Sequence, residues 1–400
     1  MRRWTMFAAL LAGCYRPALE DACTVACPDD FCPGDMQCGG DKLCHPRGTG
    51  DCSTLADANP NDTATEVCLG DGFVKQCFER PTAPLMFSTD SFDTNSGPCT
   101  LTRTEADGTT LCFLVGTRVE IDGTFRATGQ HPLVLVGVDE VVVQATGVIN
   151  VSSIHTSLIA GAGAGEAKGC APSIAIGGVN DPAETGGGGG AGGSFRARGG
   201  NGGSGNNGTQ VLAGGVAVNA LPVPSSLRGG CPGGIGGYGV SGSGGVGGYG
   251  GGAIYLLSGG MIRILGRINA SGAGGGRPNP SGGAGGGGSG GFIGLDAKAY
   301  SFDATTRVYA VGGSGGAGAS PVAVGVAGNQ ASGPSASPLT MTVGTGGSGG
   351  AGGAIGAGAA GSAASLGGGG GGGGSMGFIG MANMNVVPVG TFAPPPVAMN

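Results

Sequence analysis

The chain has 400 residues, 96 of them glycine, and a formal net charge of −6. Only 11% of the residues are charged, and the nine Lys and Arg of residues 156–400 are scattered, which excludes the basic stripe that nucleic-acid binding needs. The long amphipathic helices of a barrel enzyme are also missing from the sequence, and a chain of this length allows two or three domains.

The first 13 residues have the pattern of an export signal. Met1-Arg2-Arg3 make a basic start, and the nine residues from Trp4 to Ala12 are almost entirely apolar. A helix needs about 20 apolar residues to cross a bilayer. We therefore expect 1–13 to be a cleaved signal peptide rather than a membrane anchor.

The stretch Leu11-Ala12-Gly13-Cys14 resembles the lipobox of bacterial lipoproteins. In that family the chain is cut before the cysteine, whose sulfur carries a diacylglycerol, so the resemblance implies lipidation of Cys14 and attachment to a membrane. Tyr15 stands where an Asp would favour retention at the inner membrane in that family. The resemblance thus implies an outer membrane lipoprotein, on the surface or the periplasmic face. The alternative is an ordinary secretory signal beside a chance cysteine.

The other 12 cysteines indicate an oxidising compartment, because export and an even number both favour disulfides. Six of them lie in 14–52, which resembles short EGF-like or knottin-like modules. Disulfides compensate there for a core that so few residues cannot build. The sequence leaves their pairing open, and a zinc site is the alternative. These six are Cys23, Cys27, Cys32, Cys38, Cys44 and Cys52.

Residues 53–110 are expected to hold a polar linker followed by hairpins stapled by disulfides. Cys68 and Cys77 are close enough in sequence to close the base of a hairpin. Cys99 and Cys112 bracket a stretch of alternating threonines with a turn signal, which predicts a second stapled hairpin.

From 111 to 400 the sequence changes to short β runs that recur in one order. In one copy Ile268 and Ala270 alternate with Arg267 and Asn269, a period of two that predicts one face in a core and one face outside it. A unit this small cannot bury its apolar face alone, whereas stacked units can. The copies begin near residues 132, 252, 291 and 377.

This arrangement resembles a right-handed parallel β-helix with three strands in each coil, which predicts a mostly-β fold. Glycine-rich inserts follow the third strand of a copy at 160–252, 272–291 and 312–376. We therefore expect them to emerge from one corner and gather on one side. Pro388 and the run Ala393-Pro-Pro-Pro396 interrupt the last copy, where we expect the solenoid to fray.

Two interpretations apply to the glycine inserts. The first is loose low-complexity loops, because ordering glycine costs the most entropy and nothing apolar offsets it. The second is a bundle of extended polyglycine helices with three residues per turn, bonded through backbones that approach closely without Cβ atoms. A disulfide between Cys170 and Cys231 would stabilise the first insert by roughly 4 kcal/mol, which argues against a free loop.

One group of residues fits enzymatic chemistry. Parallel β-helix lyases and hydrolases use carboxylates with Arg or Lys on one groove face, which makes Glu120, Asp122 and Arg126 the catalytic candidates. Gly-x-Ser-x-Gly patterns occur in the glycine inserts by chance, since a hydrolase elbow needs a strand and a helix around them. The three histidines lie in separate segments, so we expect no metal and no cofactor.

The sequence divides into a signal peptide (1–13), a cysteine-rich module (14–52), a linker with stapled hairpins (53–110) and a glycine-rich β-solenoid (111–400). It resembles glycine-rich cell-surface lipoproteins of Gram-negative bacteria. The resemblance implies a non-catalytic structural or adhesive role in the cell envelope, with the membrane, a polysaccharide or a surface protein as partner. The alternative is a carbohydrate-active β-helix enzyme, either a polysaccharide lyase or a glycoside hydrolase.

Overall fold

A computed structural model gives two compact units, Met1–Thr65 and Glu66–Asn400. It describes 36–38, 44–46 and 66–399 apart from 156–158, 165–169, 171–176, 182–185, 222–223, 225, 240–242, 332, 335–343 and 385–386. The described part of the chain contains no helix long and apolar enough to cross a membrane.

In the first unit the structure describes one antiparallel pair of strands, β1 (Met36–Cys38) and β2 (Cys44–Pro46). The backbones of Cys38 and Cys44 lie opposite each other in this pair. The predicted lipidation site and the predicted disulfides of the cysteine-rich module lie outside the residues described with side chains. These residues are Cys14, Cys23, Cys27, Cys32, Cys38, Cys44 and Cys52.

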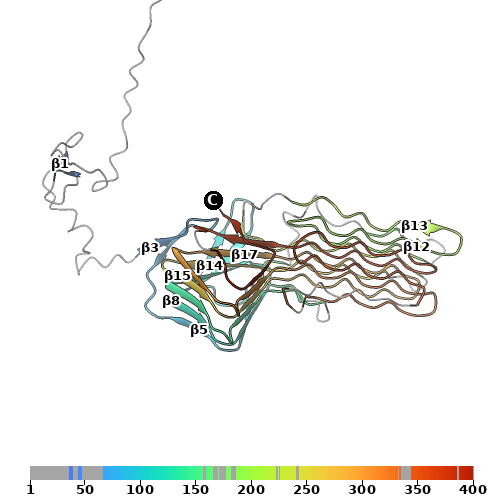
Figure 1. The fold of residues 1–400 in the computed structure, drawn as a ribbon, viewed down its shortest axis with the longest axis horizontal. Coiled ribbons are helices and arrows are strands. Elements are labelled where there is room, and N and C mark those ends of the chain that lie inside the picture. The colour runs from blue at the N-terminus through green and yellow to red at the C-terminus, as the bar shows by residue number, and fades with distance from the viewer. Residues whose placement is uncertain are drawn as a thin grey trace, which may run out of the picture. The chain divides into compact units, whose positions relative to one another are not determined.

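The second unit contains two sheets of mainly parallel strands, which the chain visits in turn (Figure 1). The ten-stranded sheet is made of β5 (Leu85–Phe87), β7 (Leu101–Thr104), β8 (Thr110–Ile121), β10 (Leu133–Val143), β14 (Ala253–Ser258), β15 (Met261–Ile264), β17 (Phe292–Asp296), β18 (Ala299–Phe302), β20 (Phe378–Met381) and β22 (Val397–Ala398). The six-stranded sheet is made of β6 (Asp90–Asp93), β9 (Thr124–Thr128), β11 (Val148–Asn150), β16 (Arg267–Asn269), β19 (Arg307–Tyr309) and β21 (Thr391–Ala393).

Each passage of the chain adds one or two strands to the first sheet and then one strand to the second. Along the first sheet β10 pairs with β14, β14 with β17 and β17 with β20, all in parallel. Along the second sheet β11, β16, β19 and β21 follow in the same order. The repeated units of the sequence therefore stack in register, and the mostly-β fold with parallel sheets is confirmed.

The main core lies between the inner faces of the two sheets. Ile254 and Ile264 from the first sheet share this cluster with Ile268 from the second, and Ile293 and Val308 occupy the next level. All five side chains are fully buried. The period of two in the sequence thus predicted correctly which residues face the core.

The alternating residues point away from this core, as predicted. Arg267 is exposed and Arg307 is partly exposed. Tyr309 packs in a separate small cluster with Val311 and with Ala331 of the insert that follows it.

Several details differ from the expectation. Three strands in each coil would build three separate sheets. Instead, the first two strands of each copy lie in the same sheet, so the coils build two sheets. The sheets also begin before residue 111, because β5 and β6 pair in parallel with β8 and β9. Fraying at the C-terminal end is wrong for the described residues, since β21 pairs with β19 and β22 pairs with β20.

Part of the outer face of the ten-stranded sheet is covered by a second core. The hairpin of β3 (Glu66–Leu69) and β4 (Gln76–Glu79) contributes Val74 and Phe78, which pack with Phe113 and Tyr255 of the sheet. Phe195 from the first glycine insert belongs to the same cluster. Both faces of this sheet are therefore buried beneath the second core, which explains the nearly continuous apolar runs there, whereas Arg263 on β15 is exposed on the outer face.

The glycine inserts leave the sheets on one side and run next to one another as long extended segments (Figure 1). We call the described residues of 160–252, 272–291 and 312–376 the polyglycine bundle. Within 282–291 the backbone N–H groups donate to three neighbouring segments in rotation, which indicates three residues per turn. Successive donors and acceptors are Gly285 to Gly276, Gly286 to Gly234, Gly287 to Gly372 and Gly288 to Ala273.

Close approach of backbones explains why these residues are glycine. A Cβ atom added to Gly286 would lie 1.9 Å from the carbonyl oxygen of Ala191, and one added to Gly371 would lie 2.0 Å from that of Gly285. Neither Gly286 nor Gly371 has a positive φ, so space and not backbone conformation imposes glycine there. The expectation of loose loops is wrong for the described inserts, and the polyglycine alternative is confirmed.

Candidate functional site

The catalytic candidates of the sequence do not form one site. Glu120 lies on β8 between the core residues Val119 and Ile121, so its side chain is on the outer face of the ten-stranded sheet. There its carboxylate lies 3.2 Å from the guanidinium of Arg118, which also lies 3.1 Å from the carboxylate of Glu140. This is a partly exposed structural ion-pair network.

The other two candidates lie in the turn that leaves β8 and on the strand that follows it. Asp122 is exposed in this turn. Arg126 lies on β9 between the core residues Phe125 and Ala127, so it faces outward from the six-stranded sheet. Its guanidinium donates a 2.9 Å hydrogen bond to a backbone carbonyl, and burial lowers its pKa. Among the described residues, no hydrogen bond or ion pair joins the three candidates.

A cleft of about 580 Å³ lies between the loop of the β3–β4 hairpin and the turn from β17 to β18. Small-molecule pockets have volumes of about 300–1,000 Å³. Asp71 and Lys75 line the hairpin side, and Asp296 and Lys298 line the sheet side. Sequence analysis did not single out these residues, because nothing in the sequence places a hairpin over this end of the sheet.

The buried carboxylate of Asp296 holds the hairpin against the sheet. Its Oδ2 atom accepts hydrogen bonds from the backbone N–H groups of Asp71 at 3.0 Å and Gly72 at 2.8 Å, and from the hydroxyl of Tyr255 at 2.9 Å. Burial, and then the nearby charge of Asp296, raises the pKa of Tyr255 above its usual range. Tyr255 therefore remains a hydrogen-bond donor, and Asp296 is a structural clamp rather than a free catalytic acid.

Removing this donor should weaken the clamp. We expect Tyr255→Phe to lower the free energy of unfolding by about 1–2 kcal/mol, because a buried carboxylate loses one of its donors. Urea denaturation measures the change. Tyr309→Phe is the matched control, since Tyr309 is also buried but its hydroxyl has no hydrogen bond among the described residues. Equal losses in the two variants would contradict the assigned role.

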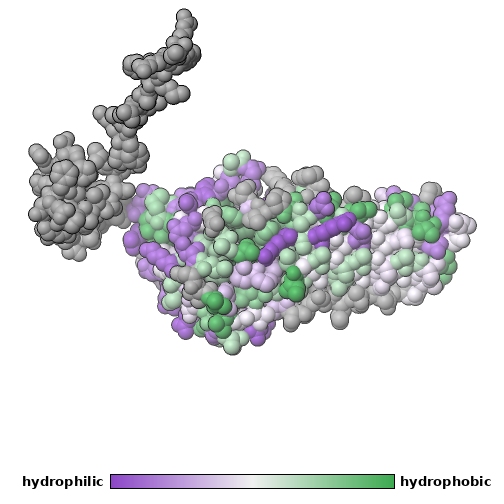
Figure 2. All heavy atoms as spheres, turned by 45° about the horizontal axis from the view of Figure 1, so that its top comes forward, coloured by the Kyte–Doolittle hydropathy of each residue, from purple (hydrophilic) through white to green (hydrophobic). Residues whose placement is uncertain are grey.

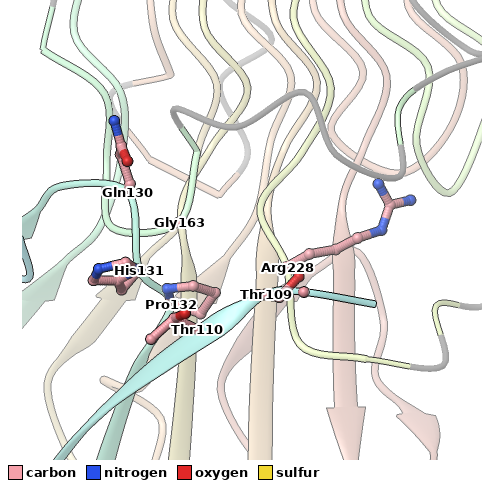
Figure 3. Close-up of a pocket in the computed structure, with 8 residues that line it drawn as sticks. Thr109, Thr110, Gln130, His131, Pro132, Gly163 and Arg228 are labelled. Atoms are coloured by element: carbon pink, nitrogen blue, oxygen red, sulfur yellow. The ribbon is translucent and has the colours of Figure 1, made fainter. Parts of the chain in front are cut away.

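A small pocket of about 40 Å³ lies next to Thr109, His131 and Pro132 (Figure 3). Arg228 borders it, but its guanidinium points away from the pocket (Figure 3) and lies over the ring of Phe195, 4.8 Å from the centroid. Desolvation lowers the pKa of Arg228. The pocket has room for little more than a water molecule.

Three disulfides predicted from the sequence are present: Cys68–Cys77, Cys99–Cys112 and Cys170–Cys231. The first two close hairpins. Both sulfur atoms of the third belong to buried residues in the cluster that covers the ten-stranded sheet. This bridge therefore joins two parts of the first glycine insert where it packs against the ten-stranded sheet.

The surface of the bundle carries side chains at every third position of its outer segments. Segments 229–239 and 243–251 lie antiparallel and are joined by hydrogen bonds from Gly233 to Gly248 and from Gly236 to Gly245. Between the glycine pairs, four apolar side chains project into solvent: Ile235 (57% exposed), Tyr238 (51%), Val246 (48%) and Tyr249 (36%). We call these four residues the apolar stripe.

The opposite flank of the bundle has a different composition at the equivalent positions. The segments 345–354 and 356–365, which bond to 367–377 rather than to 229–251, carry mainly alanine and serine between their glycines. Small side chains at these outer positions are therefore sufficient for the segments to pack, and the large apolar residues of the stripe are not required for the packing of the bundle. The signal in the sequence was the pair of Gly-Gly-Ile-Gly-Gly-Tyr and Gly-Gly-Val-Gly-Gly-Tyr repeats.

The strongly hydrophilic residues are distributed differently from the apolar ones. On the face shown in Figure 2 they gather mostly over the sheets, while the surface of the bundle is largely pale or green. Comparisons with protein-family models, with curated proteins and with solved structures give no match. The function is therefore inferred from the chemistry of the surface.

Proposed function

We propose that the chain is a non-catalytic surface lipoprotein with an adhesive role in the cell envelope. The observation that carries this proposal is the polyglycine bundle, in which three inserts far apart in sequence make one ordered body with side chains in rows on its outside. Ordering so many glycines costs more conformational entropy than any other composition. A cell that needed only a spacer could use a far simpler segment, so the displayed surface is the feature to explain.

We further propose that the two sheets form a right-handed parallel β-helix. The supporting observation is the parallel pairing of strands that follow one another at successive levels, such as β11, β16 and β19. Connections between parallel strands of one sheet are right-handed in nearly all proteins. In this arrangement the solenoid is the platform and the bundle is the displayed element.

Export and lipid attachment complete the proposal. The short apolar run before Cys14 and the lipobox-like sequence support cleavage and acylation there. Three disulfides in the described residues fit an oxidising compartment. We place the protein in the outer membrane of the cell envelope, on the surface or the periplasmic face.

Substitution of the lipidated residue tests this proposal. We expect Cys14→Ala to move the protein from the membrane fraction to the soluble fraction, because the acyl chains that hold it are lost. Fractionation followed by mass spectrometry of the N-terminal peptide measures both location and modification. Tyr15→Ala, which keeps the cysteine, should remain in the membrane fraction. Membrane association of Cys14→Ala equal to that of the parent would refute lipid anchorage.

A further inference from the structure

The apolar stripe exposes side chains that the fold could omit. Ile235 and Val246 lie next to each other on neighbouring antiparallel segments, and Tyr238 and Tyr249 lie toward opposite ends of the stripe. Contiguous exposed apolar residues on a soluble surface mark interaction sites more often than isolated ones do. Since alanine and serine occupy the equivalent positions on the opposite flank, selection for packing does not explain the stripe.

The stripe is regularly spaced on a hydrogen-bonded backbone. With about 3.1 Å per residue in this conformation, side chains three residues apart are spaced by roughly 9 Å, and the two tyrosines are separated by roughly 19 Å along the bundle. The backbone beneath is held by hydrogen bonds from Gly245 to Gly283 and from Gly248 to Gly286. A surface that repeats along one direction suits a ligand that repeats in the same way.

The stripe carries no charge. Residues 229–251 contain no Asp, Glu, Lys or Arg, so the stripe itself offers an anionic polymer no counter-charge. The exposed Arg277 borders it on the neighbouring segment, directly after Gly276, whose N–H donates to the carbonyl of Val246. Tyrosine offers a flat apolar ring and a hydroxyl at its edge. The C–H faces of a sugar ring, with hydroxyl groups around the rim, complement this combination.

The area of the stripe favours a linear polymer over a folded protein as the uncharged partner. Two neighbouring segments about 5 Å apart and roughly 19 Å long present some 200–300 Å² with their side chains. A stable protein partner or a second copy needs about 800 Å² on each side. A linear polymer does not, because it can bind many copies anchored in one membrane and gain avidity.

We infer that the apolar stripe binds a neutral polysaccharide chain, whose sugar rings lie along Ile235, Val246 and the two tyrosines. This inference rests on the adhesive function proposed above and names its ligand class. Tyr238 and Tyr249 supply the aromatic contacts at the two ends, and the two aliphatic residues fill the space between them.

Pull-down with insoluble polysaccharides tests the inference. The full-length lipoprotein in detergent is mixed with cellulose, chitin and an insoluble β-1,3-glucan, and with calcium alginate gel as an anionic comparison. We expect retention on at least one neutral polysaccharide, unchanged in 0.5 M salt, and at least a tenfold loss of affinity in the double variant Tyr238→Ala/Tyr249→Ala. Unchanged thermal melting of that variant shows that the loss is not due to unfolding.

A matched pair of variants localises the effect. Ile235→Ala should weaken retention severalfold, whereas Ile355→Ala should not, although Ile355 is 74% exposed on the opposite flank. Retention on no neutral polysaccharide, retention on alginate alone, or equal effects of the two isoleucine variants would overturn the inference. Self-association of the parent that the tyrosine variant abolishes would overturn it in favour of a second copy. Membrane fractionation of the same samples shows whether the lipoprotein proposal survives independently.

Discussion

Gly286→Ala should destabilise the second unit by about 3 kcal/mol, at the upper end of the usual cost of overpacking. The new methyl group would lie 1.9 Å from the carbonyl oxygen of Ala191. Because that oxygen belongs to a backbone and not to a flexible side chain, the two segments must separate. The hydrogen bonds from Gly286 to Gly234 and from Gly190 to Ala284 would weaken together.

The control for this substitution is another glycine in the same bundle. A Cβ atom on Gly356 meets no other atom within 4 Å, so Gly356→Ala should be neutral or should stabilise slightly by restricting the unfolded chain. Thermal melting and limited proteolysis of both variants provide the comparison. If Gly286→Ala has the same melting temperature as Gly356→Ala and the parent, the inserts are not packed as described.

Ile268→Asp should destabilise the sheets strongly, with a loss of about 4 kcal/mol or more. Ile268 is fully buried and lies in register between Ile149 and Val308 in the core. An aspartate there would be a carboxylate without a partner among aliphatic side chains. Neutralising it by protonation would reduce the cost but would still leave a polar group buried.

The neighbouring residue provides the contrast. Arg267 is exposed on the outer face of the same strand, so Arg267→Ser should change stability by no more than about 0.5 kcal/mol. Chemical denaturation at neutral pH compares the two variants with the parent. A similar stability for both would mean that the two faces of β16 have been assigned in error.

The sequence predicted the features that depend on local patterns. Period-two alternation located β16 and β19 and identified the residues that face the core, and short separations predicted the Cys68–Cys77 and Cys99–Cys112 bridges. It did not show that β10 runs continuously through two predicted strands, because a register irregularity between Gly137 and Glu140 accommodates the polar break without ending the strand.

The glycine inserts show where local reasoning fails. The entropic cost of ordering glycine is a property of each residue by itself, whereas the compensating hydrogen bonds join segments as distant as Gly190 and Gly372. The prediction of a catalytic site failed because residues that are close in sequence need not be close in space. Asp122 and Arg126 are close to Glu120 in sequence, but Asp122 lies in the turn after β8 and Arg126 lies on the other sheet, so proximity along the chain did not become proximity in space.

The rotation of hydrogen-bond partners every three residues has a consequence for how such a protein can change in length. An insertion of three residues in one of the outer segments would add one full turn, and every side chain beyond it would keep its facing. An insertion of one residue would rotate the rest of the segment by about 120°. Tyr238 would then turn toward the interior, where even a Cβ atom meets a neighbouring carbonyl. Tolerated length variants of this bundle should therefore differ by multiples of three residues.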